Sequence, residues 1–267
     1  MRKYLSIFRI RFVNTLQYRA AAFAGMATQF AWGFMLILAY MAFYRSNPNA
    51  FPMELSQMVS YIWMQQAFFA LFNAWVYADD ISNAIESGSI AYEMVRPVDL
   101  YSRWFCQVTA SRVAKAALRC APVLVVAFVA PAPFRMVLPQ SPVVLLLFLC
   151  SMVLTLFVVA AYSILVYISV FYTLSLRGVR TVLGAASDFL SGAIIPLPFF
   201  PGPVRAVLEL SPFAAMQNAP LRIYSGNLAG AAALQAVALQ LFWFAVLLGL
   251  GRLALGRALK KVVVQGG

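Results

Sequence analysis

Long stretches without a charged residue alternate with short charged stretches along this chain. Four stretches contain no Asp, Glu, Lys or Arg: residues 20–44, 55–78, 136–176 and 223–251. A helix needs about 20 apolar residues to cross roughly 30 Å of hydrocarbon. Each stretch is long enough, so the pattern predicts four membrane-spanning helices.

Two further stretches predict a span through their length and their flanks. Residues 104–133 become fully apolar only after Arg119, and residues 181–200 are apolar except for Asp188. The predicted fold is therefore an all-α integral membrane protein with six helices, at about 21–43, 57–78, 106–130, 142–172, 181–200 and 231–251. They form a single transmembrane domain over residues 20–267. Composition agrees, because 63% hydrophobic and 10% charged residues exceed what one soluble core could bury.

The distribution of Lys and Arg predicts the orientation. With six spans, 16 of the 20 basic residues lie on the side of the two termini, and the other side has only Arg45, Arg135, Arg205 and Arg222. Cytoplasmic loops carry the excess of positive charge, so both termini are expected in the cytoplasm. The net charge of +12 is then explained by topology and contact with anionic lipids, and we expect no nucleic-acid partner.

The first 19 residues predict an amphipathic helix that lies in the inner membrane interface. Leu5, Phe8 and Phe12 are at helical spacing with arginines between them. An ordinary basic flank is the alternative. The stretch lacks the apolar core and small-residue cleavage site of a signal peptide, so we expect no removal.

Several kinds of chemistry are excluded by inventory. The chain has no histidine, which excludes His-based metal sites, proton relays and Ser-His triads. Its three cysteines show no C-x-x-C spacing, and no Gly-rich loop precedes any of its four lysines. We therefore expect no enzyme activity, no bound metal and no cofactor on this chain.

Residues 79–104 form the longest polar passage, with five of the eight acidic residues. On the predicted topology they connect spans two and three in the cytoplasm. A short helix with an apolar edge that includes Ile85 can end at Gly88 in a left-handed conformation, and a second segment stops at Pro97. We interpret this punctuated loop as a docking site. A surface helix lying on the membrane is the alternative.

The sequence GSIAYEMVRPV, two residues after Glu86, resembles the E-x-G-T-L-E-x-L-L-x-x-P motif in the first cytoplasmic loop of ABC-2 type permeases. Gly88, Ser89 and Ile90 stand for Gly-Thr-Leu, and Pro97 for the closing proline. The chain departs from the commonest motif by having one acid rather than two before the glycine. The resemblance extends over essentially the whole chain and is closest to the short six-span branch.

The resemblance implies a coupling helix that fits a cleft on a cytosolic ABC ATPase subunit, which would hold the ATP and Mg. It also implies a second permease chain, identical or a sibling, and location in the bacterial plasma (inner) membrane. The implied ATPase-coupling residues are Ile85, Glu86, Gly88, Ser89, Tyr92, Arg96 and Pro97.

The segment 196–230 contains six prolines, which preclude one continuous helix, but it is too apolar for a solvated loop. It predicts a re-entrant hairpin on the outer side before span six. In ABC-2 permeases the equivalent part caps the translocation path, so the resemblance implies gate residues Pro196, Phe199, Phe200 and Pro201. A purely structural plug is the alternative.

Four charged residues are predicted inside the membrane: Asp188 near the middle of span five, and Arg112, Lys115 and Arg119 on one face of span three. They could line the translocation path and favour an anionic headgroup or substrate. Alternatively, the basic side chains extend to the interface and Asp188 pairs locally.

The resulting hypothesis is the permease subunit of an ATP-driven exporter that moves a hydrophobic or amphipathic substrate out of the cytoplasm. A secondary transporter or channel without an ATPase is the alternative, disfavoured because Asp188 is the one acid within a predicted span. A membrane-embedded enzyme would need paired acids at the surface, for which Asp79 and Asp80 are the sole candidates.

Overall fold

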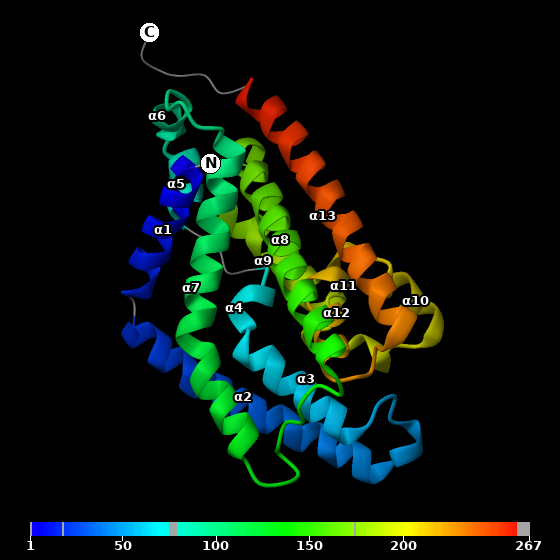
Figure 1. The fold of residues 1–267 in the computed structure, drawn as a ribbon. Helices are drawn as coiled ribbons and strands as arrows, with labels where there is room; N and C mark the ends of the chain where they lie inside the picture. Colours follow the sequence, from blue (N-terminus) through cyan, green and yellow to red (C-terminus); the bar gives the residue numbers. More distant parts are fainter. Residues whose placement is uncertain (1, 18, 75–78, 174, 261–267) are drawn as a thin grey trace.

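The computed structural model describes residues 2–17, 19–74, 79–173 and 175–260. The described residues form helices and no strand, as predicted for an all-α protein. The long helices α7, α8 and α13 lie side by side, and the tilted pair α2 and α3 closes one end (Figure 1). The short helices α5 and α6 lie at the other end, together with α1 and the last turns of α13.

Within the described residues, three helices are long and apolar enough to cross a membrane: α2 (Arg19–Ser46), α8 (Pro142–Thr173) and α13 (Gly230–Leu259). They coincide with the predicted spans 21–43, 142–172 and 231–251. Helix α7 (Leu100–Val129) covers the predicted span 106–130 except for its last residue and begins earlier. The reason is a cap: the Asp99 carboxylate accepts a hydrogen bond from the Ser102 N–H at 2.9 Å. The number of six spans stays a prediction.

The prediction of one continuous helix over 57–78 is wrong. Helix α3 (Leu55–Ala67) stops before Phe68, and the four-residue α4 (Phe69–Phe72) stops before Asn73, whose backbone is extended. A charge-free stretch contains no signal for this break, at whose end a side chain of α7 binds the carbonyl groups of Ala70 and Asn73. Residues 75–78 of the predicted span lie outside the described residues.

The prediction of a helix over 181–200 is also wrong in its extent. Helix α9 runs from Leu176 to Leu190, so its 15 residues span about 22 Å. It ends before Gly192, which has a φ of 85°. This left-handed backbone conformation favours glycine. The Ala193 N–H then bonds to the Asp188 carbonyl at 3.0 Å. Asp188 therefore lies in the last turn of α9, not in the middle of a span.

The N-terminal helix α1 (Arg2–Leu16) packs along α7 (Figure 1). Phe8 and Phe12 are half-buried and their rings stack with centroids 6.1 Å apart, whereas Leu5 is 72% exposed. A helix therefore exists where the sequence predicts one, and its aromatic edge is partly covered by the protein. Its place in the membrane interface stays a prediction.

The proline-rich segment consists of short helices: η2 (Leu197–Phe199), α10 (Gly202–Glu209), α11 (Pro212–Met216) and α12 (Asn218–Tyr224). Prolines occupy the first positions of η2, α10 and α11, where a missing N–H is not needed. Helices α11 and α12 pack against α8. The broken helical structure agrees with the proline pattern. Its depth in the membrane stays a prediction.

Candidate functional site

The polar connection after α4 folds as the sequence predicts. Helix α5 (Asp79–Glu86) is followed by Gly88 with φ of 74°, then by α6 (Ile90–Met94), which ends before Pro97. A β-carbon at Gly88 would meet no atom within 4 Å. The glycine is therefore required by the left-handed backbone and not by crowding.

The two faces of this connection differ sharply in exposure. Ile81, Ile85 and Ile90 are buried in the core, at 3%, 9% and 1% exposed. In contrast, Tyr92 is 76% exposed and Val95 81% exposed. Ile85, implied as an ATPase-coupling residue, is buried in this structure, where its side chain packs α5 on the bundle. The exposed apolar edge, which we call the α6 edge, consists of Tyr92, Met94 and Val95.

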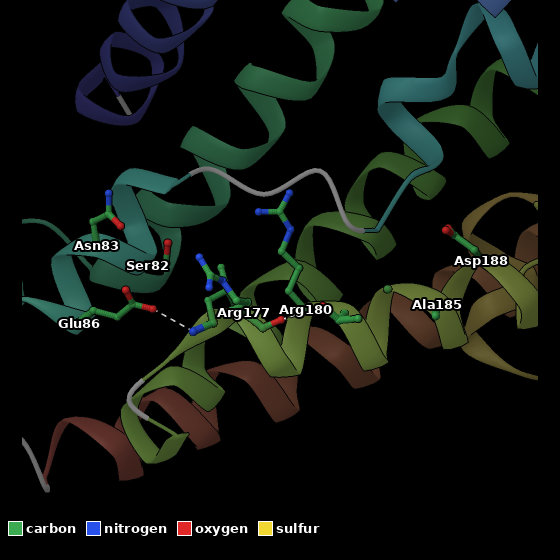
Figure 2. A pocket seen from close by; sticks show the side chains of 10 residues that line it. Ser82, Asn83, Glu86, Arg177, Arg180, Ala185 and Asp188 are labelled. Carbon is green, nitrogen blue, oxygen red and sulfur yellow. Dashed lines mark hydrogen bonds between the residues drawn. The ribbon is translucent and has the colours of Figure 1, made fainter. Parts of the chain in front are cut away.

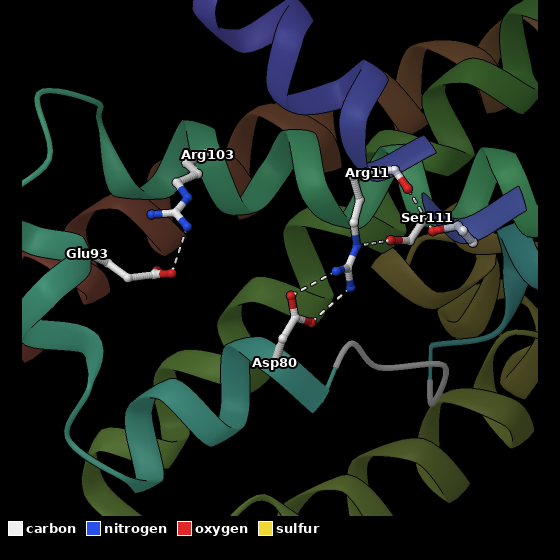
Figure 3. A network of polar contacts seen from close by, with 6 residues as sticks. Arg11, Asp80, Glu93, Arg103 and Ser111 are labelled. Atoms are coloured by element: carbon white, nitrogen blue, oxygen red, sulfur yellow. Dashed lines mark hydrogen bonds and ion pairs between the residues drawn. The ribbon is translucent and has the colours of Figure 1, made fainter. Parts of the chain in front are cut away.

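Two ion pairs attach this connection to neighbouring helices (Figure 3). The Arg11 guanidinium of α1 donates two hydrogen bonds of 2.9 Å to the Asp80 carboxylate, and its Nε donates to Ser111 Oγ of α7 at 2.8 Å. On the α6 side, Arg103 of α7 lies 2.8 Å from a carboxylate oxygen of Glu93. The buried Trp104 indole also donates to Glu93, at 3.2 Å. The connection is thus bound to both α1 and α7.

A third attachment reaches α9. One carboxylate oxygen of Glu86 accepts a hydrogen bond of 2.9 Å from the backbone N–H of Leu176, the first residue of α9 (Figure 2). The first N–H groups of a helix have no partner within the helix, and a negative charge there is favourable. Glu86, predicted as an ATPase contact, therefore joins α5 to the start of α9. A cavity of about 630 Å³ lies beside this contact.

The remaining predicted coupling residues lie on or near the surface. Ser89 precedes α6, and its hydroxyl is 2.9 Å from the Ser87 hydroxyl. Arg96 and Pro97 are exposed, and the Pro97 carbonyl accepts a hydrogen bond from the Lys3 ammonium at 2.8 Å. The structure therefore brings α1 against the end of this connection, a contact that the sequence did not predict.

The predicted stripe on span three does not share one environment. Arg112 is 1% exposed, and its guanidinium donates to the Ala70 and Asn73 carbonyls at 3.1 and 2.7 Å and to Ser163 Oγ at 2.9 Å. It binds backbone carbonyl groups where α4 ends, which favours the structural alternative, and its place on a translocation path stays a prediction. Lys115 is half-buried. Arg119 lines a different space, together with Asp188.

That space is a cleft of about 580 Å³ between α2, α3, α4, α7 and the turn after α9. Arg119 and Asp188, two of the four charged residues predicted inside the membrane, both line it. Gly25 of α2 also lines it, and a β-carbon there would lie 2.6 Å from Arg119 Cζ. The close approach of α2 to the Arg119 guanidinium therefore depends on glycine.

The predicted gate residues lie near the break between α9 and α10. Phe199 packs against Tyr40 and Phe51, with ring centroids 5.1 and 5.0 Å apart, and lines an apolar cavity of about 400 Å³. Phe200 packs against Phe189 at 5.4 Å. Pro196 is buried and Pro201 is exposed. Pro196 is thus buried and the rings of Phe199 and Phe200 are half-buried against other aromatic rings, an arrangement compatible with a gate and with a plug.

Sequence reasoning missed the amide side chains of the cleft. Gln29, Gln65, Gln66 and Asn73 all lie within stretches that were predicted as spans on the absence of charge. Polar uncharged residues in such stretches were the available signal. Among the described residues, no group of His, Cys, Asp and Glu is arranged to hold a metal ion.

A comparison with protein families gives a match over most of the chain. The family model described as an ABC-2 family transporter protein matches residues 30–266, which includes every helix from α3 to α13 and most of α2. A comparison with curated proteins finds no match.

Proposed function

Since the chain belongs to the ABC-2 transporter family, we propose that it is the transmembrane permease subunit of an ATP-driven exporter. Its substrate would be a hydrophobic or amphipathic molecule that leaves the cytoplasm. A separate cytosolic ATPase subunit would bind ATP and Mg, and a second permease chain, identical or a sibling, would complete the path. On this proposal the chain lies in the bacterial inner membrane with both termini in the cytoplasm, as the distribution of basic residues favours.

The α6 edge is the observation that carries the proposal. Tyr92 and Val95 are among the most exposed large apolar side chains of the described residues. They lie on a loop that the buried side chains of Ile81, Ile85 and Ile90 fix to the bundle. Exposed apolar side chains on a fixed polar scaffold are typical of a protein interface. The α6 edge would therefore be the surface that a cytosolic ATPase contacts.

The attachments of the loop suggest how movement of the ATPase would reach the membrane helices. A displacement of α6 would act on α7 through Glu93, on α1 through Asp80, and on α9 through Glu86. Helix α9 leads directly to the turn and short helices that contain the predicted gate. ATP-dependent closure would favour the outward-open state only if the closed ATPase binds that state more tightly.

The test is a pull-down of the tagged chain from gently solubilised native membranes, with mass spectrometry of the co-purifying proteins. We expect an ATPase with a phosphate-binding loop, with or without a second permease chain. Tyr92→Asp should strongly reduce the recovered ATPase, because it places a charge in an apolar interface. Leu138→Asp is the matched control, since Leu138 is 73% exposed but lies between α7 and α8 at the other end of the bundle.

Equal recovery of the ATPase with both variants would refute the α6 edge as its docking surface. Recovery of the chain without any ATPase, under conditions that preserve a known ABC complex, would refute the permease proposal itself. Recovery of a differently tagged copy would establish a homodimer, and recovery of a sibling chain alone a heterodimer.

A further inference from the structure

The cleft beside Arg119 contains buried amide groups that the fold leaves without hydrogen bonds. Gln29 is 5% exposed, and neither its Nε2 nor its Oε1 has a hydrogen-bond partner among the described residues. Gln217 is 2% exposed, and its Nε2 likewise has none. Both residues line the cleft. Buried polar groups are normally paired, and each exception requires an explanation.

Other amide groups line the same cleft, and a hydrogen bond holds one of them, Gln65, in place. The Gln65 Nε2 donates to the Ala193 carbonyl at 2.8 Å, which ties α3 to the turn after α9. Gln66 and Asn73 contribute two more side-chain amides. The polar surface of the cleft therefore comes from α2, from α3 and the residues just after α4, and from the segment before α12. An amide cluster drawn from several elements resembles the polar part of a small-molecule site.

The charges and rings of the cleft restrict the ligand. Arg119 and Asp188 both line it, so their formal charges cancel and a ligand with a net charge is not favoured. A carboxamide both donates and accepts hydrogen bonds, which matches a hydroxyl group. Trp32 and Phe69 supply aromatic rings, and Ile194 an apolar edge that is 57% exposed. The cleft therefore combines amides, rings and an apolar border.

We propose that this cleft binds the uncharged, hydroxyl-rich headgroup of an amphiphile, of which a sugar linked to a lipid is the simplest form. The headgroup hydroxyls pair with Gln29 and Gln217, the rings of Trp32 and Phe69 cover apolar faces of the sugar, and the apolar tail leaves past Ile194. This inference rests on the proposed function, since the amphiphile would be the molecule that the permease moves.

The first test measures binding to the full chain, purified in a detergent without a sugar headgroup. Native mass spectrometry compares three lipids with identical acyl chains: glucosyl diacylglycerol, phosphatidylcholine and phosphatidic acid. We expect the glucosyl lipid to bind about tenfold more tightly than either of the others. Equal or tighter binding of the zwitterionic or the anionic lipid would overturn the assignment of an uncharged headgroup.

The second test separates binding from folding. Gln29→Leu should weaken binding of the glucosyl lipid about tenfold without lowering the melting temperature, because it removes two unpaired polar atoms from a buried site. A side chain that only supports the fold would show the opposite, a lower melting temperature. Gln235→Leu is the control, because Gln235 of α13 lines a different cavity. The affinity of this variant for the glucosyl lipid should not change. Unchanged affinity in Gln29→Leu would overturn the proposal.

A further variant is available if Gln29→Leu does not fold. Trp32 is 53% exposed, so Trp32→Ala should fold, and it should lose affinity for the glucosyl lipid. Full affinity in Trp32→Ala would also refute the assignment. These measurements need no ATPase. Failure of lipid binding while the ATPase still co-purifies would remove only the ligand assignment. Lipid binding without any ATPase would remove only the permease proposal.

Discussion

Replacement of Arg112 by methionine tests whether this buried arginine supports the fold or lines a transport path. Its guanidinium binds the Ala70 and Asn73 carbonyls, which lie at the break after α4, and also Ser163 of α8. Methionine has a shorter side chain of similar volume and no donor. Arg112→Met therefore removes the donors of two buried carbonyl groups and leaves the volume nearly filled.

The contacts set the expected magnitude. A buried acceptor that loses its partner costs about 1–3 kcal/mol, so the two carbonyls together predict a loss of about 2–6 kcal/mol in the free energy of unfolding. The Ser163 hydroxyl keeps its own hydrogen bond to the Val159 carbonyl at 2.8 Å, so it adds little. Relief from burying a charge opposes the loss, which favours the lower half of the range.

Unfolding by sodium dodecyl sulfate in lipid bicelles, followed by circular dichroism, measures this loss. Arg45→Met is the matched control, because Arg45 is exposed at the end of α2 and should change the free energy by less than about 0.5 kcal/mol. If the Arg112→Met variant were as stable as the Arg45→Met variant, the structural role of Arg112 would be refuted. If transport were also lost at unchanged stability, the arginine would belong to the path after all.

Three further substitutions test the contacts of the loop and the cleft. Glu86→Gln removes a negative charge beside the start of α9 and should destabilise the first turn of α9 by about 0.3–1 kcal/mol, measured as faster amide hydrogen exchange in that turn. Unchanged exchange would contradict the contact. Gly88→Ala forces an alanine to a φ of 74° and should lower the free energy of unfolding by about 1–2 kcal/mol. Gly178→Ala within α9 is the control, because no atom lies near its β-carbon, and it should be neutral or stabilising. Equal effects of the two substitutions would refute the left-handed turn. Gly25→Ala places a β-carbon 2.6 Å from Arg119 Cζ, at the flexible end of a long side chain, so the guanidinium should shift and the free energy of unfolding should fall by no more than about 1 kcal/mol; a larger loss would show that the guanidinium is held in place.

Local chemistry predicted the loop better than hydrophobicity predicted the spans. The helix end at Gly88 and the stop at Pro97 follow from the backbone preferences of single residues, and the structure has both. The break after α4 depends on Arg112, which is 42 residues from Ala70 and 39 from Asn73. No feature within the stretch 57–78 signals that a distant side chain will satisfy its carbonyl groups, so the charge-free stretch was read as one helix.

The roles of individual side chains were harder to predict than the elements that contain them. Ile85 and Tyr92 are both apolar residues on short helices of one loop, and only packing separates the buried side chain from the exposed one. The spacing of Arg112 and Arg119 does not reveal that one binds α4 while the other lines the cleft. Gln29 was missed because charge, not amide content, was used to find functional residues within apolar stretches.

The three attachments of the loop differ in their surroundings, which orders their strength. The Glu93 and Arg103 side chains are 20% and 12% exposed, and Glu93 also accepts from the buried Trp104. Asp80 and Arg11 are 48% and 29% exposed, so water and salt screen their attraction more.

The Glu86 contact joins one exposed side chain to one backbone N–H. Of these three contacts, the one that joins α6 to α7 is therefore the least screened by water. On the proposed function, a force on Tyr92 and Val95 would reach α7 through Glu93, and it would reach α9 through the Glu86 contact.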